Sequence, residues 1–235
     1  MSKDRLTAFF DAVLAIVMTV LVLSLKQPAA ATLSAVLALH KEYLTYATSF
    51  FVLCITWHNL HNTFQVVRKI NGGVLWANSL LLFMISFFPY VTTFVSDHFF
   101  ARVAEFFFGI VFLLISLMYV LLCFTLYWAD KSNKALFQVI YRPRKFTIYF
   151  LIQIIGFICG YFYPPAIIIA VIIATAVWII PERRAEQIIK KQHQHKKKHS
   201  PDLKYLVSVF TYVNPFCIPS NSINYGCTLS FASMR

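Results

Sequence analysis

Charged residues are scarce in this sequence, and acidic residues are the scarcest. Only 13% of its 235 residues are charged, and only nine residues are Asp or Glu. Soluble domains carry about 25% charged residues, so this composition excludes an ordinary soluble domain. Hydrophobic residues make up 59% of the chain, which predicts an all-α integral membrane protein.

Sequence motifs for catalysis are also missing. The chain has no HExxH motif and no Gly-x-Ser setting for a nucleophile. Asp11 is the one acidic residue well inside an apolar stretch, because Glu105 lies near the end of its stretch. An intramembrane hydrolase needs an activated nucleophile, a carboxylate pair or a metal. The sequence therefore predicts a protein that is not an enzyme.

Cysteine and histidine do not form a metal-binding pattern. The five cysteines are scattered and contain no CxxC pair, so we expect neither a disulfide framework nor a metal cluster. His58 and His61 are three residues apart, but a zinc site needs three or four ligands. We expect these histidines to form hydrogen bonds, and we expect no cofactor.

Six apolar stretches are candidates for membrane-spanning helices, which need about 20 mostly apolar residues. They lie at 6–25, 43–64, 75–96, 103–128, 146–162 and 165–181. Pro164 and Pro165 separate the last two stretches and predict a tight hairpin, because proline lacks a backbone donor and restricts the residue before it. The first stretch is too long for a signal-peptide core and has no small-residue cleavage site, so we expect it in the mature protein.

Basic residues near the helix ends predict the orientation in the membrane. With the N-terminus inside, the cytoplasmic segments contain Lys3, Arg5, Arg68, Lys69, Lys131, Lys134, Arg142, Arg144, Lys145, Arg183, Arg184, Lys190 and Lys191. The opposite side has only Lys26, Lys41 and Arg102. We therefore expect both termini in the cytoplasm. Topology and attraction to anionic lipid explain the net charge of +12 without nucleic acid as a partner.

Asp11 makes the first apolar stretch a candidate functional site. An ionised carboxylate at membrane depth is costly unless it is paired or hydrated. Asp11 lies in the first turns of the expected helix, where the helix dipole favours a negative charge, and Arg5 precedes it. We expect partners for both residues on neighbouring helices.

One face of the same stretch is apolar. Ile16, Val20 and Leu23 are four and three residues apart, so they share one stripe of a helix, and Thr19 lies next to that stripe. Ordinary packing or lipid contact would explain such a stripe equally well. From residue types alone, both interpretations remain open.

Polar residues at 57–62 interrupt the second apolar stretch. We expect Asn59 and His61, together with Asn78 of the third stretch, to form hydrogen bonds across helices and to satisfy the charges of the first stretch. Such bonds contribute about 1 kcal/mol each. Pro89 predicts a kink in the third stretch.

These residues form a family pattern. The first helix reads Arg5-x-x-x-Phe9-x-Asp11 and then Ala15-Ile16-x-x-Thr19-x-x-Val22-Leu23. Later parts are Trp57-x-Asn59-x-His61, the run from Asn78 to Pro89, and the ending from Trp178 to Arg184. Together, over roughly residues 3–186, they resemble the bacterial relatives of the endolysosomal potassium channel, transmembrane protein 175.

The resemblance implies a homotetramer of six-helix subunits whose first helices line a central pore. It assigns Ile16, Val20 and Leu23 to an apolar pore constriction. It places Thr19 where it faces or supports the conduction path. The family usually has leucine where this chain has Val20, and we expect the shorter side chain to widen the constriction.

The resemblance also implies a polar network that anchors the first helix to the second and third helices. Its members here are Arg5, Asp11, Asn59, His61 and Asn78. Two positions depart from the family pattern: Phe10 stands where serine is usual, and Ala12 replaces a common glycine. We expect the missing hydroxyl to alter the network.

The sequence lacks a TVGYG selectivity filter and any acidic run suited to forming a ring. Selectivity must then come from an apolar constriction, which dewets and favours loosely hydrated ions. We predict a potassium-permeable cation channel with modest selectivity over sodium. The alternative is a proton-coupled or proton-conducting transporter that uses Asp11 and His61. Transporters typically have broken helices, and only six glycines are available to form them.

Two regions of the chain differ in composition. We expect residues 1–184 to form the six-helix channel domain, in a multi-pass protein of the bacterial cell membrane. We expect residues 185–235 to form a basic, poorly ordered cytoplasmic tail near anionic headgroups. The sequence assigns no function to this tail.

Overall fold

The computed structural model describes residues 2–141 and 143–179, and within these ranges the fold is all-helical, without strands. The elements are α1 (Lys3–Leu23), α2 (Leu33–Ala38), α3 (His40–Val66), α4 (Gly72–Ser86), α5 (Phe88–Asp97), α6 (Arg102–Ala129), α7 (Lys134–Ile140), α8 (Pro143–Phe162) and α9 (Ala166–Ile179). The expected tail at 185–235 lies outside the described residues, as does the end of the stretch at 165–181.

The predicted apolar stretches coincide with the long helices. The first, second and fourth fall on α1, α3 and α6, and the last two form the hairpin of α8 and α9. The third stretch is divided between α4 and α5, which meet at Phe87. Pro89 occupies the first turn of α5, where its missing N–H costs least. The predicted kink is therefore a break between two helices.

Among the described residues, four segments are long and apolar enough to cross a membrane: Lys3–Leu23, Gly72–Asp97, Arg102–Ala129 and Lys134–Phe162. α9 is apolar but has only 14 residues. α3 has 27 residues but carries the polar run at 57–62. The structure thus supports several membrane-spanning helices, and the count of six remains a prediction.

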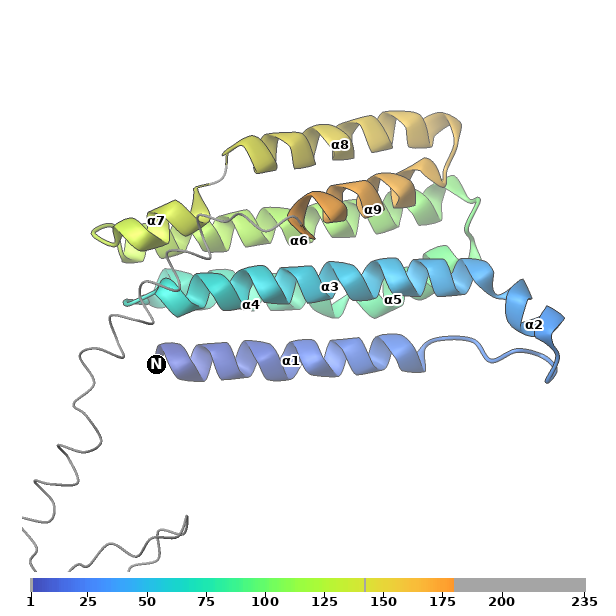
Figure 1. Cartoon of the computed structure of the whole chain (residues 1–235), viewed down its shortest axis with the longest axis horizontal. Helices are drawn as coiled ribbons and strands as arrows, with labels where there is room; N and C mark the ends of the chain where they lie inside the picture. Colours follow the sequence, from blue (N-terminus) through green and yellow to red (C-terminus); the bar gives the residue numbers. More distant parts are fainter. Residues whose placement is uncertain (1, 142, 180–235) are drawn as a thin grey trace, which may run out of the picture. The chain divides into compact units, whose positions relative to one another are not determined.

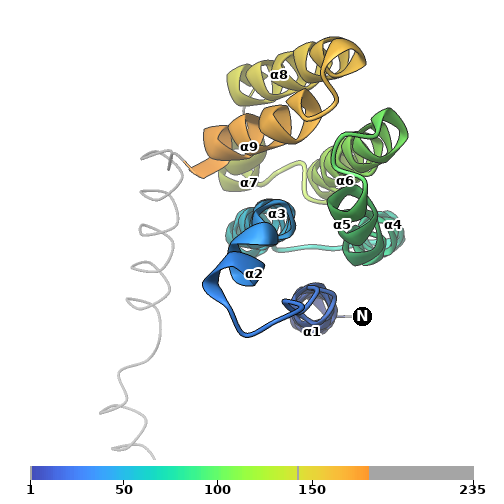
Figure 2. The same cartoon turned by 90° about the vertical axis from the view of Figure 1, so that its right-hand side faces the viewer.

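The long helices run side by side in a bundle, with α1 along one edge and α8 along the opposite edge (Figures 1 and 2). α1 packs against α3, α4 and α5, whereas α9 lies between α8 and the helices α3 and α6. α1 is therefore covered on one side only.

The covered side of α1 follows from its sequence. Its buried residues recur every three or four positions and so form one face: Leu6, Phe10, Leu14, Val17 and Leu21. Ser2 caps the helix by accepting a hydrogen bond from the backbone N–H of Arg5. Phe10, which stands where the related family usually has serine, is 1% exposed and packs in this core.

Candidate functional site

The apolar stripe of α1 lies on the side of the helix that no other described helix covers. Ile16, Val20 and Leu23 are 62%, 44% and 81% exposed, respectively. Large apolar side chains exposed along one helix indicate a surface that contacts lipid or another protein chain. The structure therefore leaves the predicted constriction residues available for an interface around a pore.

Thr19 lies on the same exposed side of α1. Its hydroxyl donates to the carbonyl of Ile16 at 2.7 Å. This bond ties the donor of Thr19 to the helix backbone and leaves the hydroxyl oxygen as an acceptor facing outward. Such an oxygen can contact a cation or a water molecule beside the apolar stripe.

Asp11 finds its partner on α3. The indole Nε1 of Trp57 donates to Asp11 Oδ1 at 2.9 Å. The Trp57 ring also stacks on the His61 ring, with centroids 5.2 Å apart and planes at 27°. The amide of Gln65 donates to His61 Nε2 at 2.9 Å. The structure thus joins Asp11 and His61 through Trp57, a partner that the sequence analysis did not assign.

The other expected members of the network lie apart from Asp11. Arg5 is exposed, and among the described residues the ion pair within 4 Å is Lys26–Asp97, not Arg5–Asp11. Arg5 and Asp11 are six residues apart, so they lie about 240° apart around the helix.

Two asparagines also lie away from Asp11. Asn59 lines a pocket on another side of α3. Asn78 on α4 is fully buried, and its side-chain amide has no hydrogen-bond partner among the described residues. The network that the structure shows at Asp11 is therefore smaller than the expected one.

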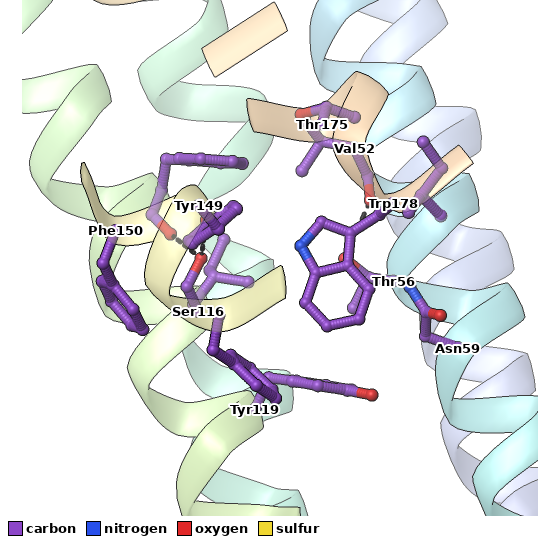
Figure 3. A pocket seen from close by; sticks show the side chains of 13 residues that line it. Val52, Thr56, Asn59, Ser116, Tyr119, Tyr149, Phe150, Thr175 and Trp178 are labelled. Carbon is purple, nitrogen blue, oxygen red and sulfur yellow. Dashed lines mark hydrogen bonds between the residues drawn. The ribbon is translucent and has the colours of Figure 1, made fainter. Parts of the chain in front are cut away.

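The pocket beside Asn59 has a volume of about 50 Å³ and lies among α3, α6, α8 and α9 (Figure 3). Six of its thirteen lining residues are aromatic, among them Tyr149 on α8 and Trp178 on α9, and Tyr149 is hydrogen-bonded to Ser116. None of its lining residues carries a carboxylate, an amine or an imidazole. The pocket therefore has no pair of groups for acid–base chemistry at neutral pH.

The described ranges contain no group of three or more His, Cys, Asp or Glu side chains placed to hold a metal ion. Cys54 and Cys159 are free thiols. Within these ranges, the arrangement of side chains points to an exposed helix face and its anchoring contacts, not to a reaction centre.

Comparison with known proteins assigns the family. The model of the endosomal/lysosomal potassium channel TMEM175 family matches residues 5–89. A protein named as a potassium channel from Chryseobacterium sp. (strain P1-3) is 33% identical over 191 residues, which cover 81% of this chain and all of that protein. This chain belongs to the TMEM175 family.

Further relatives of this TMEM175 family member support the assignment. A protein named as a potassium channel from Chamaesiphon minutus is 32% identical over 124 residues, 49% of this chain and 61% of that protein. The fold is similar to the crystal structure of a lysosomal potassium-selective channel TMEM175 homolog from the same organism. The TM-score is 0.66 at 23% identity, over 78% of this chain and 97% of the other.

Family membership confirms three expectations from the sequence. The resemblance to transmembrane protein 175 is correct. The protein is an integral membrane protein, as the apolar helices indicate. It belongs to a family named for channels and not for enzymes.

Proposed function

We propose that this TMEM175 family member is a potassium-permeable cation channel. Four six-helix subunits assemble around a central pore that the α1 helices line. The observation that carries the proposal is the exposed stripe of Ile16, Val20 and Leu23 on the side of α1 opposite its packed face. The names of the related proteins as potassium channels support the choice of ion.

Four copies of the stripe would stack as apolar rings along the pore. A narrow apolar ring disfavours water and makes it costly for an ion to lose its hydration shell. The cost is smaller for potassium than for the more tightly hydrated sodium. The pore therefore selects modestly for potassium, which is the permeant ion and not a cofactor, and Thr19 offers an oxygen beside the rings.

The anchoring role belongs to Asp11 and Trp57. Their hydrogen bond connects α1 to α3 on a side of α1 away from the stripe, and the ring of His61 supports Trp57. Arg5, Asn59 and Asn78 lie apart from this pair, and their place in the anchoring set stays a prediction from the family resemblance. In this arrangement both termini face the cytoplasm of a bacterial cell, and the basic tail lies near anionic lipid headgroups.

Substitution of the stripe tests the proposal. Ile16→Ala and Leu23→Ala each widen one ring, so we expect higher conductance and a lower potassium-to-sodium permeability ratio in bilayer recordings. Ile154→Ala is the matched control, because Ile154 is 55% exposed on α8, away from α1. Unchanged conductance and selectivity in both stripe variants would remove these residues from the pore.

A transporter remains the second candidate, because Asp11 and His61 both contact Trp57. An indole donates a hydrogen bond but does not accept one, so Trp57 does not relay protons between the two groups. A carrier saturates with ion concentration and couples two gradients, whereas a channel gives ohmic currents. Measurement of potassium flux with and without a proton gradient distinguishes the two functions.

A further inference from the structure

The C-terminal end of α1 is held by an ion pair. The helix ends at Leu23, and the hydroxyl of Ser24 donates to the Leu21 carbonyl at 2.7 Å. Two residues further, the Lys26 ammonium lies 2.6 Å from Asp97 Oδ1. Lys26 lies three residues beyond the most exposed member of the apolar stripe.

Asp97 provides a fixed point for this contact. It is the last residue of α5, which packs against α1, α3 and α6. Val91 and Val95 of the same helix are fully buried, so the end of α5 is tied to the core of the bundle. A displacement of Lys26 relative to Asp97 is therefore a displacement of the end of α1 relative to the bundle.

The chain around Lys26 has little other support. No residue from 24 to 32 is buried, and Leu21 is the last buried residue of α1. The segment that follows contains Pro28 and three consecutive alanines at 29–31, all exposed. The contact of the Lys26 side chain with Asp97 therefore helps to fix the position of the last turn of α1.

A second carboxylate faces the same ammonium group. Glu42 at the start of α3 lines one cavity of about 10 Å³ with Lys26 and another with Asp97. Its Oε2 atom is buried and has no hydrogen-bond partner. The hydrogen bond and charge of Asp97 raise the pKa of Lys26, and the charge of Glu42 adds to this rise. Lys26 is therefore held as a cation between α3 and α5.

We infer that Lys26 and Asp97 are a positioning pair that fixes the end of α1, and with it Leu23, against α5. The pair thereby sets how closely the Leu23 side chains approach one another around the pore. This inference rests on the proposed function, because it assumes that Leu23 narrows an ion path. Neither residue needs to touch the permeant ion.

The test exchanges the two charges in purified protein reconstituted in liposomes. We expect Lys26→Gln and Asp97→Asn each to lower the potassium-to-sodium permeability ratio, because loss of the ion pair releases the end of α1. The double exchange Lys26→Asp with Asp97→Lys restores an ion pair and moves the ratio back toward that of the unmodified protein, although Glu42 then faces a carboxylate at position 26. Lys26→Arg keeps the charge and leaves the ratio unchanged.

Lys41→Gln is the matched control. Lys41 is a cation that lines the same cavity as Asp97, but its ammonium lies over the Phe100 ring, 4.4 Å from the centroid. Removing this charge tests whether any loss of positive charge near the end of α1 alters conduction. We expect the permeability ratio of Lys41→Gln to equal that of the unmodified protein.

The outcomes separate this inference from the proposed function. If the unmodified protein conducts no ions, the proposed function fails. If it conducts, and the single variants keep its permeability ratio or lose only thermal stability, the positioning role is wrong and the channel stands. If one single variant does not assemble, the other decides, because its assembled channels lack the ion pair and must show the lowered ratio.

Discussion

The contact between Asp11 and Trp57 satisfies two groups at once. A carboxylate in a membrane helix is costly without a partner, and a tryptophan N–H usually binds an acceptor when it is removed from water. The 2.9 Å bond meets both needs and links α1 to α3. The bond joins α1 to α3 away from the exposed stripe, and the proposed anchoring role assigns it a share in the orientation of α1.

Replacement of Trp57 by Phe tests the contribution of this bond. Phenylalanine keeps an aromatic ring beside His61 but has no donor for Asp11. Hydrogen bonds to charged groups contribute about 1.5–3 kcal/mol to stability, and the partial exposure of Trp57 reduces this contribution. We therefore expect the free energy of unfolding to fall by about 1 kcal/mol. Thermal unfolding of the detergent-solubilised protein measures it, with Trp76→Phe as control because Trp76 is 74% exposed.

Equal unfolding temperatures for Trp57→Phe, Trp76→Phe and the unmodified protein would contradict the anchoring role of the bond. We expect Trp57→Phe to have the lowest unfolding temperature, and Trp76→Phe and the unmodified protein to have equal ones.

The sequence located part of the candidate site. It identified Asp11 from the cost of a carboxylate in an apolar helix, and the stripe from its spacing. It did not identify Trp57 as the partner, because the sequence does not fix which face of α3 meets α1. Once Trp57 faces α1, His61 follows four residues later on the same face, and Asn59 points away.

At the scale of elements, the most extensive contact between described helices is that of α8 with α9. Gly156 and Gly160 lie four residues apart on α8, the spacing that allows helix backbones to approach closely in membranes. A Cβ atom at Gly156 would overlap the methyl group of Ala170 on α9. The observed packing of α8 against α9 therefore requires glycine at position 156.

Gly156→Ala should separate these two helices. Overpacking of a tight contact costs about 1–3 kcal/mol, and we expect a lower unfolding temperature in detergent. Combination with Ala170→Gly removes the overlapping methyl group and should recover most of the loss. Gly72→Ala is the control, since nothing lies within 4 Å of a Cβ there. If the double variant does not regain the unfolding temperature, the overlap with the Ala170 methyl group is not the cause of the lost stability.

The sequence predicted the long elements better than the short ones. Length and apolar content located α1, α3, α6, α8 and α9, and the prolines located the break before α5 and the turn before α9. The short helices α2 and α7 were not predicted, because six or seven residues give too little periodicity. Their stability depends on contacts with neighbouring helices.

At the scale of the whole molecule, the structure shows a single chain with one uncovered helix face. Its α1 helix exposes a row of large apolar side chains, and family membership makes a channel the expected use of that row. The boundary at residues 184 and 185, the cytoplasmic tail and the orientation remain predictions from composition and charge. The number of subunits is likewise a prediction.

A mass measurement tests the predicted assembly. The detergent-solubilised protein should have a protein mass four times the 27.1 kDa of the chain. Native mass spectrometry separates this from a monomer or a dimer without dependence on shape. A monomer that nevertheless conducts ions would rule out a pore formed by four α1 helices.

Cysteine modification during ion flux shows whether the apolar stripe of α1 lines the ion path. In a variant without native cysteines, Leu23→Cys or Ile16→Cys is treated with a charged, water-soluble thiol reagent. Ile154→Cys on α8 serves as the comparison. We expect the reagent to block potassium flux through both α1 variants and to leave the flux through Ile154→Cys unaffected. If the reagent blocks Ile154→Cys and leaves full flux through both α1 variants, the stripe does not line the ion path.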